Sequence, residues 1–506
     1  MTTYSSSFET SPKRSFSEEY ESQFMRRTPE APAAPPPPPP SEQQPAPPPV
    51  RESAIFSKAA EVFLNNAEKA KWHDATFWSV RTKRDNMAKN LDEWEQLRQM
   101  ASDIKRHTIT HMDEYLDRFA TNAENNGVTV HWAKDAREFN GTVLDILRSH
   151  GVKKMVKSKS MLTEECEMNP YLENNGIEVV ETDLGERIIQ LMHSKPSHIV
   201  MPAIHITQEE VGHLFEKELG SEKGNYDPTY LTYCARMSLR DEFMTAQAGM
   251  TGANFGVAET GDIVVCTNEG NADMSTSMPK LHIAAIGLEK VIPDYRSLAV
   301  FQRLLSRSGT GQPTTTFTSH FRKARPDGEM HIILVDNGRS DIIADKEHWE
   351  TLKCIRCGSC MNTCPVYRRS GGYSYTYFIP GPIGINLGML RDRYSFSDNV
   401  SACSLCCSCD NVCPAKVNLS EQIYLWRQKL ESLQRAKKQK KLISEGLKYV
   451  FDRPRLYSTA LKFAPIVNTL PRFLKYNGLN DWGKGRELPE FAKESFQTLW
   501  KKGKVK

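Results

Sequence analysis

Two short stretches of this sequence space their cysteines identically. Residues 354–365 read CIRCGSCMNTCP and residues 403–414 read CSLCCSCDNVCP. In each stretch, two residues separate the first cysteine from the second, and two more separate the second from the third. Three residues separate the third cysteine from the fourth, and a proline follows the fourth directly. This is the spacing of bacterial ferredoxins, and it predicts two [4Fe-4S] clusters.

The spacing also predicts which cysteines bind together. A cubane needs four thiolates, and one short loop wraps three corners before its own backbone obstructs the fourth. In two-cluster ferredoxins the last cysteine of each run therefore ligates the other cluster. We expect one cluster on Cys354, Cys357, Cys360 and Cys413, and the other on Cys403, Cys406, Cys409 and Cys364.

Zinc is the alternative ligand of paired C-x-x-C elements. A zinc ribbon takes two cysteines from each of two knuckles, which leaves the third thiolate and the Cys-Pro of both runs without a role. Nine of the 12 cysteines lie between Cys354 and Cys413, which favours metal binding over scattered disulfides. Cys407 fits neither run and is interpreted as a packed neighbour, with a redox or ligand role as the alternative.

Arginines beside the runs are candidates for tuning the clusters, which are anionic when bound to four thiolates. These arginines are Arg356, Arg368 and Arg369. Plain surface arginines are the alternative interpretation. The 38 residues between Cys364 and Cys403 exceed a compact ferredoxin hairpin and point to a helical ferredoxin architecture.

The chain of 506 residues is too long for one core, and we expect several units. The Pro-rich segment near the N-terminus predicts extended polyproline rather than a packed core. The predicted units are a disordered Pro-rich tail (1–53), a helical arm (54–120), an α/β domain (121–344), a helical ferredoxin-type domain (345–430) and a basic helical region (431–506).

Short apolar runs alternate with helical stretches in the third unit, which predicts a parallel α/β sheet. The runs read VTVHWA, KKMVKS, IEVVET and SHIVMP, and later FGVAET, DIVVCT and HIAAIG extend the same sheet. Ligands in such sheets collect at strand ends. Polar residues at the turns around Glu259 and from Thr267 to Asn271 are therefore candidates, as is the glycine loop from Ser308 to Gln312, which would offer N–H groups to an anion. Simple turn chemistry is the competing interpretation.

Charge is segregated along the chain, whose formal net charge is +4. Residues 431–506 hold 18 Lys/Arg against 7 Asp/Glu. Such a region binds an acidic partner, an anionic membrane face or nucleic acid, or is a solvated helical surface. No recognised nucleic-acid motif accompanies it, so we expect no nucleic acid. No segment has the ~18 apolar residues of a membrane span, and Arg26-Arg27 is not followed by an apolar stretch. We expect a cytoplasmic protein, with peripheral contact at the inner membrane face as a further expectation.

Four segments together resemble the lactate-utilisation protein B family: NFGVAETGDIVVCTNEGNADMSTSMPKLHIAAIGLEKVIP, LLSRSGTGQPTTTF and the two cysteine runs with their flanks. The resemblance extends from about residue 60 to about 480. It implies an iron–sulfur subunit of a three-part system that oxidises L-lactate to pyruvate, together with a cysteine-rich A-type partner and a small C-type partner.

The resemblance also implies an α/β domain similar to the sugar-isomerase and CoA-transferase superfamily. CoA transferases use a glutamate next to glycine as nucleophile, which makes Glu259 and Glu269 weak catalytic candidates, with Asn271 beside them. Three roles follow. The chain relays electrons through its clusters, or its α/β domain is itself the catalytic unit that binds the hydroxy acid, or that domain is a scaffold that docks partners. An oxidoreductase component active only with partner subunits is the expectation common to them.

Overall fold

A computed structural model describes residues 56–432, 438–476 and 489–504. The tail predicted for residues 1–53 lies outside these ranges. Four helices open the described chain: α2 (Phe56–Leu64), α3 (Ala67–Lys89), α4 (Trp94–Thr110) and α5 (Met112–Asn125).

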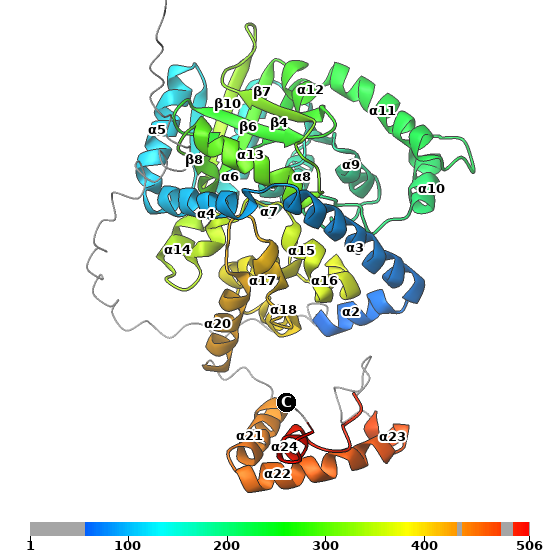
Figure 1. Cartoon of the computed structure of the whole chain (residues 1–506). Coiled ribbons are helices and arrows are strands. Elements are labelled where there is room, and N and C mark those ends of the chain that lie inside the picture. Colours follow the sequence, from blue (N-terminus) through cyan, green and yellow to red (C-terminus); the bar gives the residue numbers. More distant parts are fainter. Residues whose placement is uncertain (1–55, 433–437, 477–488, 505–506) are drawn as a thin grey trace, which may run out of the picture. The chain divides into compact units, whose positions relative to one another are not determined.

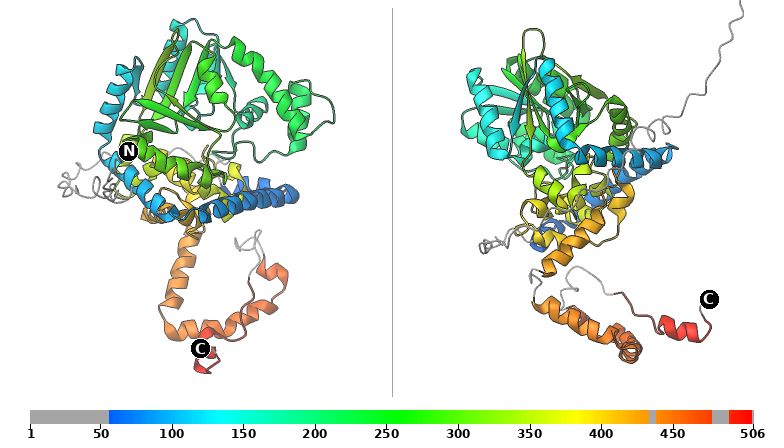
Figure 2. Two further views of the ribbon diagram at one scale, coloured as in Figure 1. Left: turned by 45° about the horizontal axis from the view of Figure 1, so that its top comes forward. Right: turned by 90° about the vertical axis from the view of Figure 1, so that its left-hand side faces the viewer.

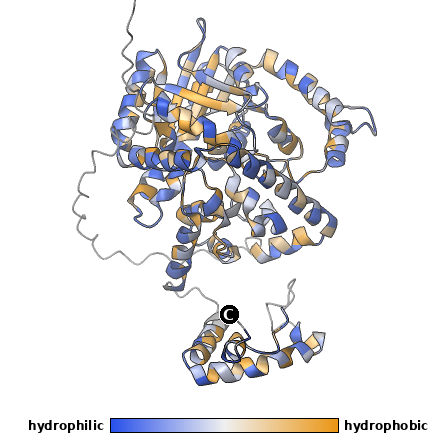
Figure 3. Cartoon of the chain, in the orientation of Figure 1, coloured by the Kyte–Doolittle hydropathy of each residue, from blue (hydrophilic) through white to orange (hydrophobic). Residues whose placement is uncertain are grey.

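Six parallel strands form the central sheet of the α/β unit, which confirms the predicted parallel-sheet domain. Their spatial order is β1-β10-β7-β4-β2-β3. The bounds are β1 (Thr129–Ala133), β2 (Lys154–Lys157), β3 (Glu178–Glu181), β4 (Ala248–Gly252), β7 (Leu281–Gly287) and β10 (Glu329–Val335). These strands are mostly hydrophobic in Figure 3, as expected for a sheet covered on both faces.

Each face of the sheet has its own core, because successive side chains of a strand point to opposite faces. On one face, Ile283 and Ile333 pack with helices α6 (Ala136–Ser149), α7 (Met161–Glu165) and α8 (Met168–Asn174). On the other face, Ile286 and Ile332 pack with Leu116 and Phe119 of α5. Helix α5 thus belongs structurally to the sheet.

A second sheet corrects one prediction. FGVAET and DIVVCT do not extend the parallel sheet. They form β5 (Phe255–Val257) and β6 (Asp262–Thr267), which pair antiparallel within a sheet of order β8-β5-β6-β9. The other members are β8 (Val291–Ile292) and β9 (Phe317–Phe321). SHIVMP is also not a strand: residues 197–202 are irregular, and Ile199, Val200 and Met201 line a cavity instead.

Six further helices complete the α/β unit. They are α9 (Leu184–Leu191), α10 (Gln208–Glu218), α11 (Pro228–Thr245), α12 (Asn271–Ser277), α13 (Tyr295–Gly309) and α14 (Arg339–Ala344). Phe215 of α10 and Leu231 of α11 share a small core with Ile188 of α9. The far end of α11 packs Phe243 onto Val156 and Val180, which anchors this helical pair to the sheet (Figure 1).

The cysteine-bearing unit is helical, as predicted. It contains α15 (Ser359–Thr363), α16 (Pro365–Ser370), α17 (Gly381–Arg391), α18 (Ser397–Ala402), α19 (Ser408–Val412) and α20 (Leu419–Ser432). Helix α3 lies alongside α15 and α16, as the views of Figures 1 and 2 show. Its buried His73 donates a hydrogen bond from Nδ1 to the Arg368 carbonyl oxygen at 2.9 Å. The N-terminal helices therefore help to enclose the cysteine runs.

The basic C-terminal region is helical where it is described. Its helices are α21 (Lys438–Phe451), α22 (Pro454–Phe463), α23 (Arg472–Lys475) and α24 (Phe496–Lys501). Large apolar side chains on them are exposed, including Leu442 (72%), Phe463 (62%) and Phe473 (70%). In the parts of the chain that the structure describes, no helix is long and apolar enough to cross a membrane.

Candidate functional site: two cysteine groups and an adjoining cavity

The two cysteine runs follow the same backbone path. The third residue of each run is left-handed, Arg356 with φ 60° and Leu405 with φ 53°. The fifth residue is left-handed as well, Gly358 with φ 78° and Cys407 with φ 58°. These turns curl each run into a tight loop, after which a short helix begins.

The loops direct backbone N–H groups at the cysteine sulfurs. The N–H of Arg356 donates to Cys354 Sγ at 3.4 Å, and the equivalent N–H of Leu405 donates to Cys403 Sγ at 3.3 Å. The last cysteines accept in the same way, Cys364 from Tyr367 at 3.5 Å and Cys413 from Val417 at 3.4 Å. N–H donors at sulfur stabilise thiolates that carry charge, which is the state that an iron cluster requires.

The fold brings cysteines of the two runs close to one another. Burial raises the pKa of Cys360 well above its usual value, and the neighbouring Cys354 and Cys357 raise it further, as do Cys409 and Cys413. Cys413 of the second run thus lies beside the first run. In the same way burial raises the pKa of Cys409, with contributions from Cys364, Cys403 and Cys406. Cys364 of the first run thus lies beside the second.

The arrangement fits two cubane clusters better than zinc. A tetrahedral zinc ion with four thiolates at about 2.3 Å holds their sulfurs about 3.8 Å apart. Among the residues that the structure describes, no three cysteines bring their sulfurs within 4.8 Å of one another. A cubane binds each thiolate at a separate iron and so spreads the four ligands further apart. The residues present therefore fit [4Fe-4S] clusters.

Cations from the N-terminal helices support the loops, and sequence reasoning missed them. Arg98 of α4 donates from Nε to the Cys413 carbonyl at 2.9 Å and from Nη2 to the Asp410 carbonyl at 3.0 Å. Arg84 of α3 donates to the Val412 carbonyl at 3.1 Å. Both lie more than 250 residues before these partners, and no local pattern marks them.

The three arginines named from the sequence divide into two kinds. Arg356 belongs to the first loop itself. Arg368 instead lies 3.5 Å from Asp74 and stacks on Trp78, while Arg369 is 75% exposed at its side chain and pairs with the same Asp74. The latter two join the cysteine unit to α3.

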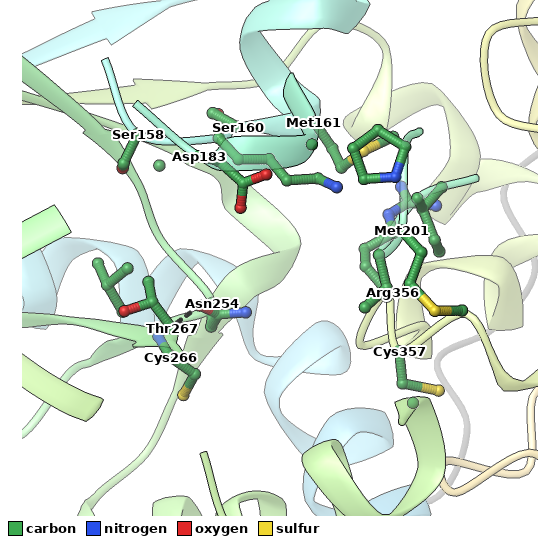
Figure 4. A pocket seen from close by; sticks show the side chains of 18 of the residues that line it. Ser158, Ser160, Met161, Asp183, Met201, Asn254, Cys266, Thr267, Arg356 and Cys357 are labelled. Carbon is green, nitrogen blue, oxygen red and sulfur yellow. Dashed lines mark hydrogen bonds between the residues drawn. The ribbon is translucent and has the colours of Figure 1, made fainter. Parts of the chain in front are cut away.

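A cavity of about 520 Å³ lies between the sheet and the first cysteine run. Its walls come from the segments that follow the carboxyl ends of β2, β3, β4 and β7, and from Arg356 and Cys357. Figure 4 shows Asp183 and Asn254 on one side of the space, and Arg356 and Cys357 on the other. Ligand sites of open α/β sheets occur at this edge.

Hydrogen bonds fix the cavity wall to the cysteine unit. Asn362 of α15 donates from Nδ2 to the Gly309 carbonyl at 2.9 Å, and its Oδ1 lies 3.0 Å from His198 Nε2. His198 Nδ1 accepts two backbone N–H groups, so Nε2 carries the proton and donates to Asn362. Burial lowers the pKa of His198 to about 3, which keeps the ring neutral. Tyr367 donates to the Ser197 carbonyl at 2.7 Å.

The structure separates the three weak catalytic candidates. Glu269 and Asn271 line the cavity, whereas Glu259 does not and instead accepts the Tyr295 N–H at 3.4 Å. Glu269 accepts the Leu184 N–H at 3.0 Å, and burial raises its pKa to about 7, with Asp183 adding to the effect. Asn271 is buried, and its Oδ1 has no hydrogen-bond partner within the described residues.

The glycine loop lines the cavity but does not offer the N–H groups expected of it. The N–H groups of Thr310, Gly311 and Gln312 all point to the Ser306 carbonyl, at 3.1, 3.2 and 3.3 Å, and so close the end of α13. The cavity's cations come from elsewhere, from Lys159, Lys290, Arg339 and Arg356. Of these, only Arg356 was singled out from the sequence.

Comparison with known proteins places these features in a family. Residues 116–339 match the model of the LUD domain, and residues 350–417 match that of the 4Fe-4S dicluster domain. The protein therefore carries two [4Fe-4S] clusters.

Several curated proteins are similar over most of the chain. "Lactate utilization protein B" of Shouchella clausii is 39% identical over 463 residues, which cover 88% of this chain and 97% of that protein. "Uncharacterized electron transport protein YkgF" of Escherichia coli is 37% identical, over 84% of this chain and 91% of its own. A solved DUF162 family protein from Deinococcus radiodurans is 13% identical over 44% of this chain and 98% of its own, with a TM-score of 0.26. Because the match to the curated relatives joins the α/β unit and the dicluster unit along almost their whole length, this chain belongs to the lactate utilization protein B family.

Proposed function

We propose that this protein is the electron-transfer subunit of a multi-component system that oxidises L-lactate to pyruvate. One observation carries the proposal: Cys357 forms part of the wall of the cavity at the carboxyl edge of the sheet. An electron donor bound there, or delivered there by a partner, lies directly beside the first cysteine group. Family membership supports lactate as the source of the electrons.

We further propose the ligand sets predicted from the spacing. Cluster I is bound by Cys354, Cys357, Cys360 and Cys413, and cluster II by Cys403, Cys406, Cys409 and Cys364; the grouping of the thiols supports this assignment. When bound, each cluster supplies a one-electron acceptor. Oxidation of lactate releases two electrons and two protons, so the two clusters together match one substrate molecule.

The chain's own residues position the clusters and exclude water. Cys357, Cys360, Cys409 and Cys413 are buried. Arg84 and Arg98 place positive charge and N–H donors behind the Asp410–Cys413 segment, which favours the charged thiolates. Cys406 is exposed. A cluster held by the second run would therefore have one solvent-facing ligand, through which electrons would leave.

EPR on the anaerobically purified chain tests the relay. Mixed with A-type and C-type lactate-utilisation proteins, its clusters should become reduced on addition of L-lactate, and omission of any one component should abolish that signal. A preparation whose clusters are reduced by dithionite but never by lactate, with all three components present, would contradict the proposal.

A second candidate function is that the α/β unit itself binds the hydroxy acid. The cavity favours it, because Lys159, Lys290, Glu269 and Asn271 converge there from separate elements. The relation that we propose to the sugar-isomerase and CoA-transferase superfamily supports the same edge of the sheet. If Glu269→Gln and Asn271→Ala leave lactate binding and turnover unchanged in the reconstituted system, the α/β unit is a docking scaffold instead.

We also propose that the region 438–504 docks the subunit to its partners or to an anionic membrane face. Its helices carry exposed apolar side chains beside the basic charge, a combination that binds interfaces. Deletion from residue 438 should release the chain from the A-type and C-type proteins in a pull-down, or from anionic vesicles in flotation. Retention in both assays would exclude this role.

A further inference from the structure

We infer that Lys290 and Arg356 form a subsite for the carboxylate of a small organic acid, and that this subsite shares its positive charge with cluster I, so that acid binding and cluster reduction oppose each other. The inference rests on the second candidate function, binding of an acid in the cavity, and specifies where the acid binds and what its binding changes.

Lys290 supplies an uncommitted cation. It follows β7 through a short 3-10 turn (Leu288–Lys290) and lines the cavity. Within the described ranges its ammonium group has no recorded hydrogen bond or ion pair, and burial lowers its pKa to about 8. Glu289 acts on this ammonium group without contacting it, and a desolvated ammonium group that no carboxylate contacts favours an anion beside it.

Arg356 joins the cavity to the cluster loop. Its backbone N–H donates to Cys354 Sγ, and its guanidinium lines the cavity next to Cys357. The side chain is 12% exposed, its separation from the Glu289 carboxylate is 3.7 Å, and Nη1 is buried without a hydrogen-bond partner among the described residues. Its hydrogen-bonding capacity is therefore incompletely used.

The nearby carboxylates are already engaged by another cation. Glu289 accepts from Arg339 Nε, and Glu165 lies 3.0 Å from Arg339 Nη2. Burial alone would raise the pKa of Glu289, but Arg339 and the other cations outweigh it and lower that pKa to about 2. Three cations of the cavity wall, Lys290, Arg339 and Arg356, thus face two carboxylates, and the buried Lys105, which donates to the Glu289 carbonyl, adds to the positive charge at this end of the cavity.

The opposite end of the cavity disfavours an anion. Asp183 caps α9 there, accepting the Glu186 N–H at 3.2 Å, and Glu269 accepts the neighbouring Leu184 N–H. Lys159 also lies on that wall, but Glu186 pairs with it at 3.4 Å, so the two carboxyl groups repel a carboxylate and suit a hydroxyl group instead. The charges therefore orient a hydroxy acid with its carboxylate toward the cysteine run.

Shared cations create the coupling. Lys290 and Arg356 both line the cavity together with Cys357, and Arg356 also belongs to the loop whose backbone N–H binds Cys354 Sγ, so the same positive charges act on the acid and on the first cysteine run. Reduction adds one negative charge to the cluster and weakens the attraction of these cations for the acid. By linkage, a bound acid must lower the potential of cluster I by the corresponding amount. Electron uptake would thus promote release of the oxidised acid.

The test uses the full chain with both clusters intact. Calorimetric titration with L-lactate and with pyruvate, on oxidised and on dithionite-reduced protein, measures the affinities, and EPR-monitored redox titration with and without either acid measures the potential of cluster I. We expect tighter binding to the oxidised protein and a lower potential when the acid is bound. Lys290→Gln should weaken binding about tenfold, the loss of one charged hydrogen bond, and should abolish the shift, while Lys290→Arg should retain both.

Two controls keep the outcomes distinct. Lys280→Gln removes an exposed lysine outside the cavity and should behave as wild type. Arg356→Gln should weaken acid binding as Lys290→Gln does, provided that iron analysis shows cluster I intact. If Arg356→Gln loses cluster I, the result for Lys290→Gln alone decides the inference. Binding that is unchanged by Lys290→Gln, or a potential that does not respond to bound acid, overturns this inference but leaves an acid site in the cavity. Absence of any acid binding to wild type removes the second candidate function as well.

Discussion

Cys407 occupies in the second cysteine run the position that Gly358 occupies in the first, and both have left-handed backbones, with φ 58° and 78°. The ninth cysteine of the region thus stands at a turn position where glycine is the least strained residue. Its thiol is exposed and accepts a hydrogen bond from Ser420 Oγ at 3.4 Å.

Cys407→Gly should retain all the iron and stabilise the protein by up to about 1 kcal/mol, since glycine removes the cost of the left-handed conformation. Iron content and thermal denaturation of the anaerobic protein measure both effects. Loss of iron on this substitution would show that Cys407 is a ligand.

Gly358→Ala should have the opposite effect. A Cβ atom at this position would lie 2.9 Å from His198 Cε1, and the backbone conformation is unfavourable for alanine as well. We expect destabilisation by about 2 kcal/mol and selective loss of cluster I. Equal occupancy of both clusters in this variant would show that the loop adapts.

Double substitutions test the exchange of ligands between the runs. If Cys413 serves the first group, then Cys354→Ala with Cys413→Ala should lose the same half of the iron as either single change. Cys354→Ala with Cys364→Ala should lose all of it. The reverse pattern in iron analysis and EPR would mean that each run ligates its own cluster.

Asn362→Ala should loosen the cavity wall. The change leaves the Gly309 carbonyl and His198 Nε2 buried and unpaired, which costs about 1–3 kcal/mol for each group. Asn411 is the matched control, because it holds the same place in the second run and is exposed; Asn411→Ala should cost less than about 0.5 kcal/mol. Thermal denaturation compares the two, and equal losses would contradict the role of Asn362.

The free energy of unfolding should depend on pH through the ionisation of His150. Its bond to the Ile146 carbonyl at 2.8 Å, followed by its pairing with Glu329 at 3.0 Å, raises its pKa. A pKa raised in the folded state gives stability that is fully present below the unfolded value near 6.5 and disappears as pH rises through the folded value. Because the ring is 34% exposed, solvent limits the effect to about 0.5 kcal/mol.

His150→Gln should therefore destabilise the protein at pH 6 and have less effect at pH 8.5. Melting temperatures of wild type and variant at the two values measure the difference. His213→Gln, at an exposed histidine of α10, controls for general effects of losing an imidazole. An identical difference at both pH values would exclude the ionised His150 pair.

The parts of the molecule that sequence reasoning reached are those with local signals. Each cysteine run places its four spaced cysteines within 12 residues, so the motif is recognised locally. Strands β1 to β3 are predicted because each is a short apolar run between two helical stretches. β5 and β6 have the same apolar pattern, but their pairing with each other and with β9 depends on distant segments, so the pattern alone predicts the wrong sheet for them. SHIVMP is apolar because it forms part of the cavity wall and packs against the cysteine unit, and not because it is a strand.

Residues whose partners lie far away in the sequence cannot be predicted from local patterns. Arg98 reaches the Cys413 carbonyl only because α4 folds beside the dicluster unit. Lys290 is a candidate binding residue only because it lines a cavity that four strand ends and one cysteine loop enclose. Neither residue lies in a motif. Glu269 and Asn271 follow β6, whose carboxyl end lies at the cavity, whereas Glu259 follows β5, which runs antiparallel to β6 and therefore ends at the opposite edge of the same sheet.

The packing of α3 against α15 and α16 has a consequence for synthesis in the cell. Phe77 and His73 are buried against Tyr367, nearly 300 residues later in the chain. The ribosome therefore finishes the first helices long before their partners exist, and the second cysteine run, which ends at Cys413, emerges later still. The first helices therefore leave Phe77 and His73 exposed through most of synthesis, until Tyr367 has been made.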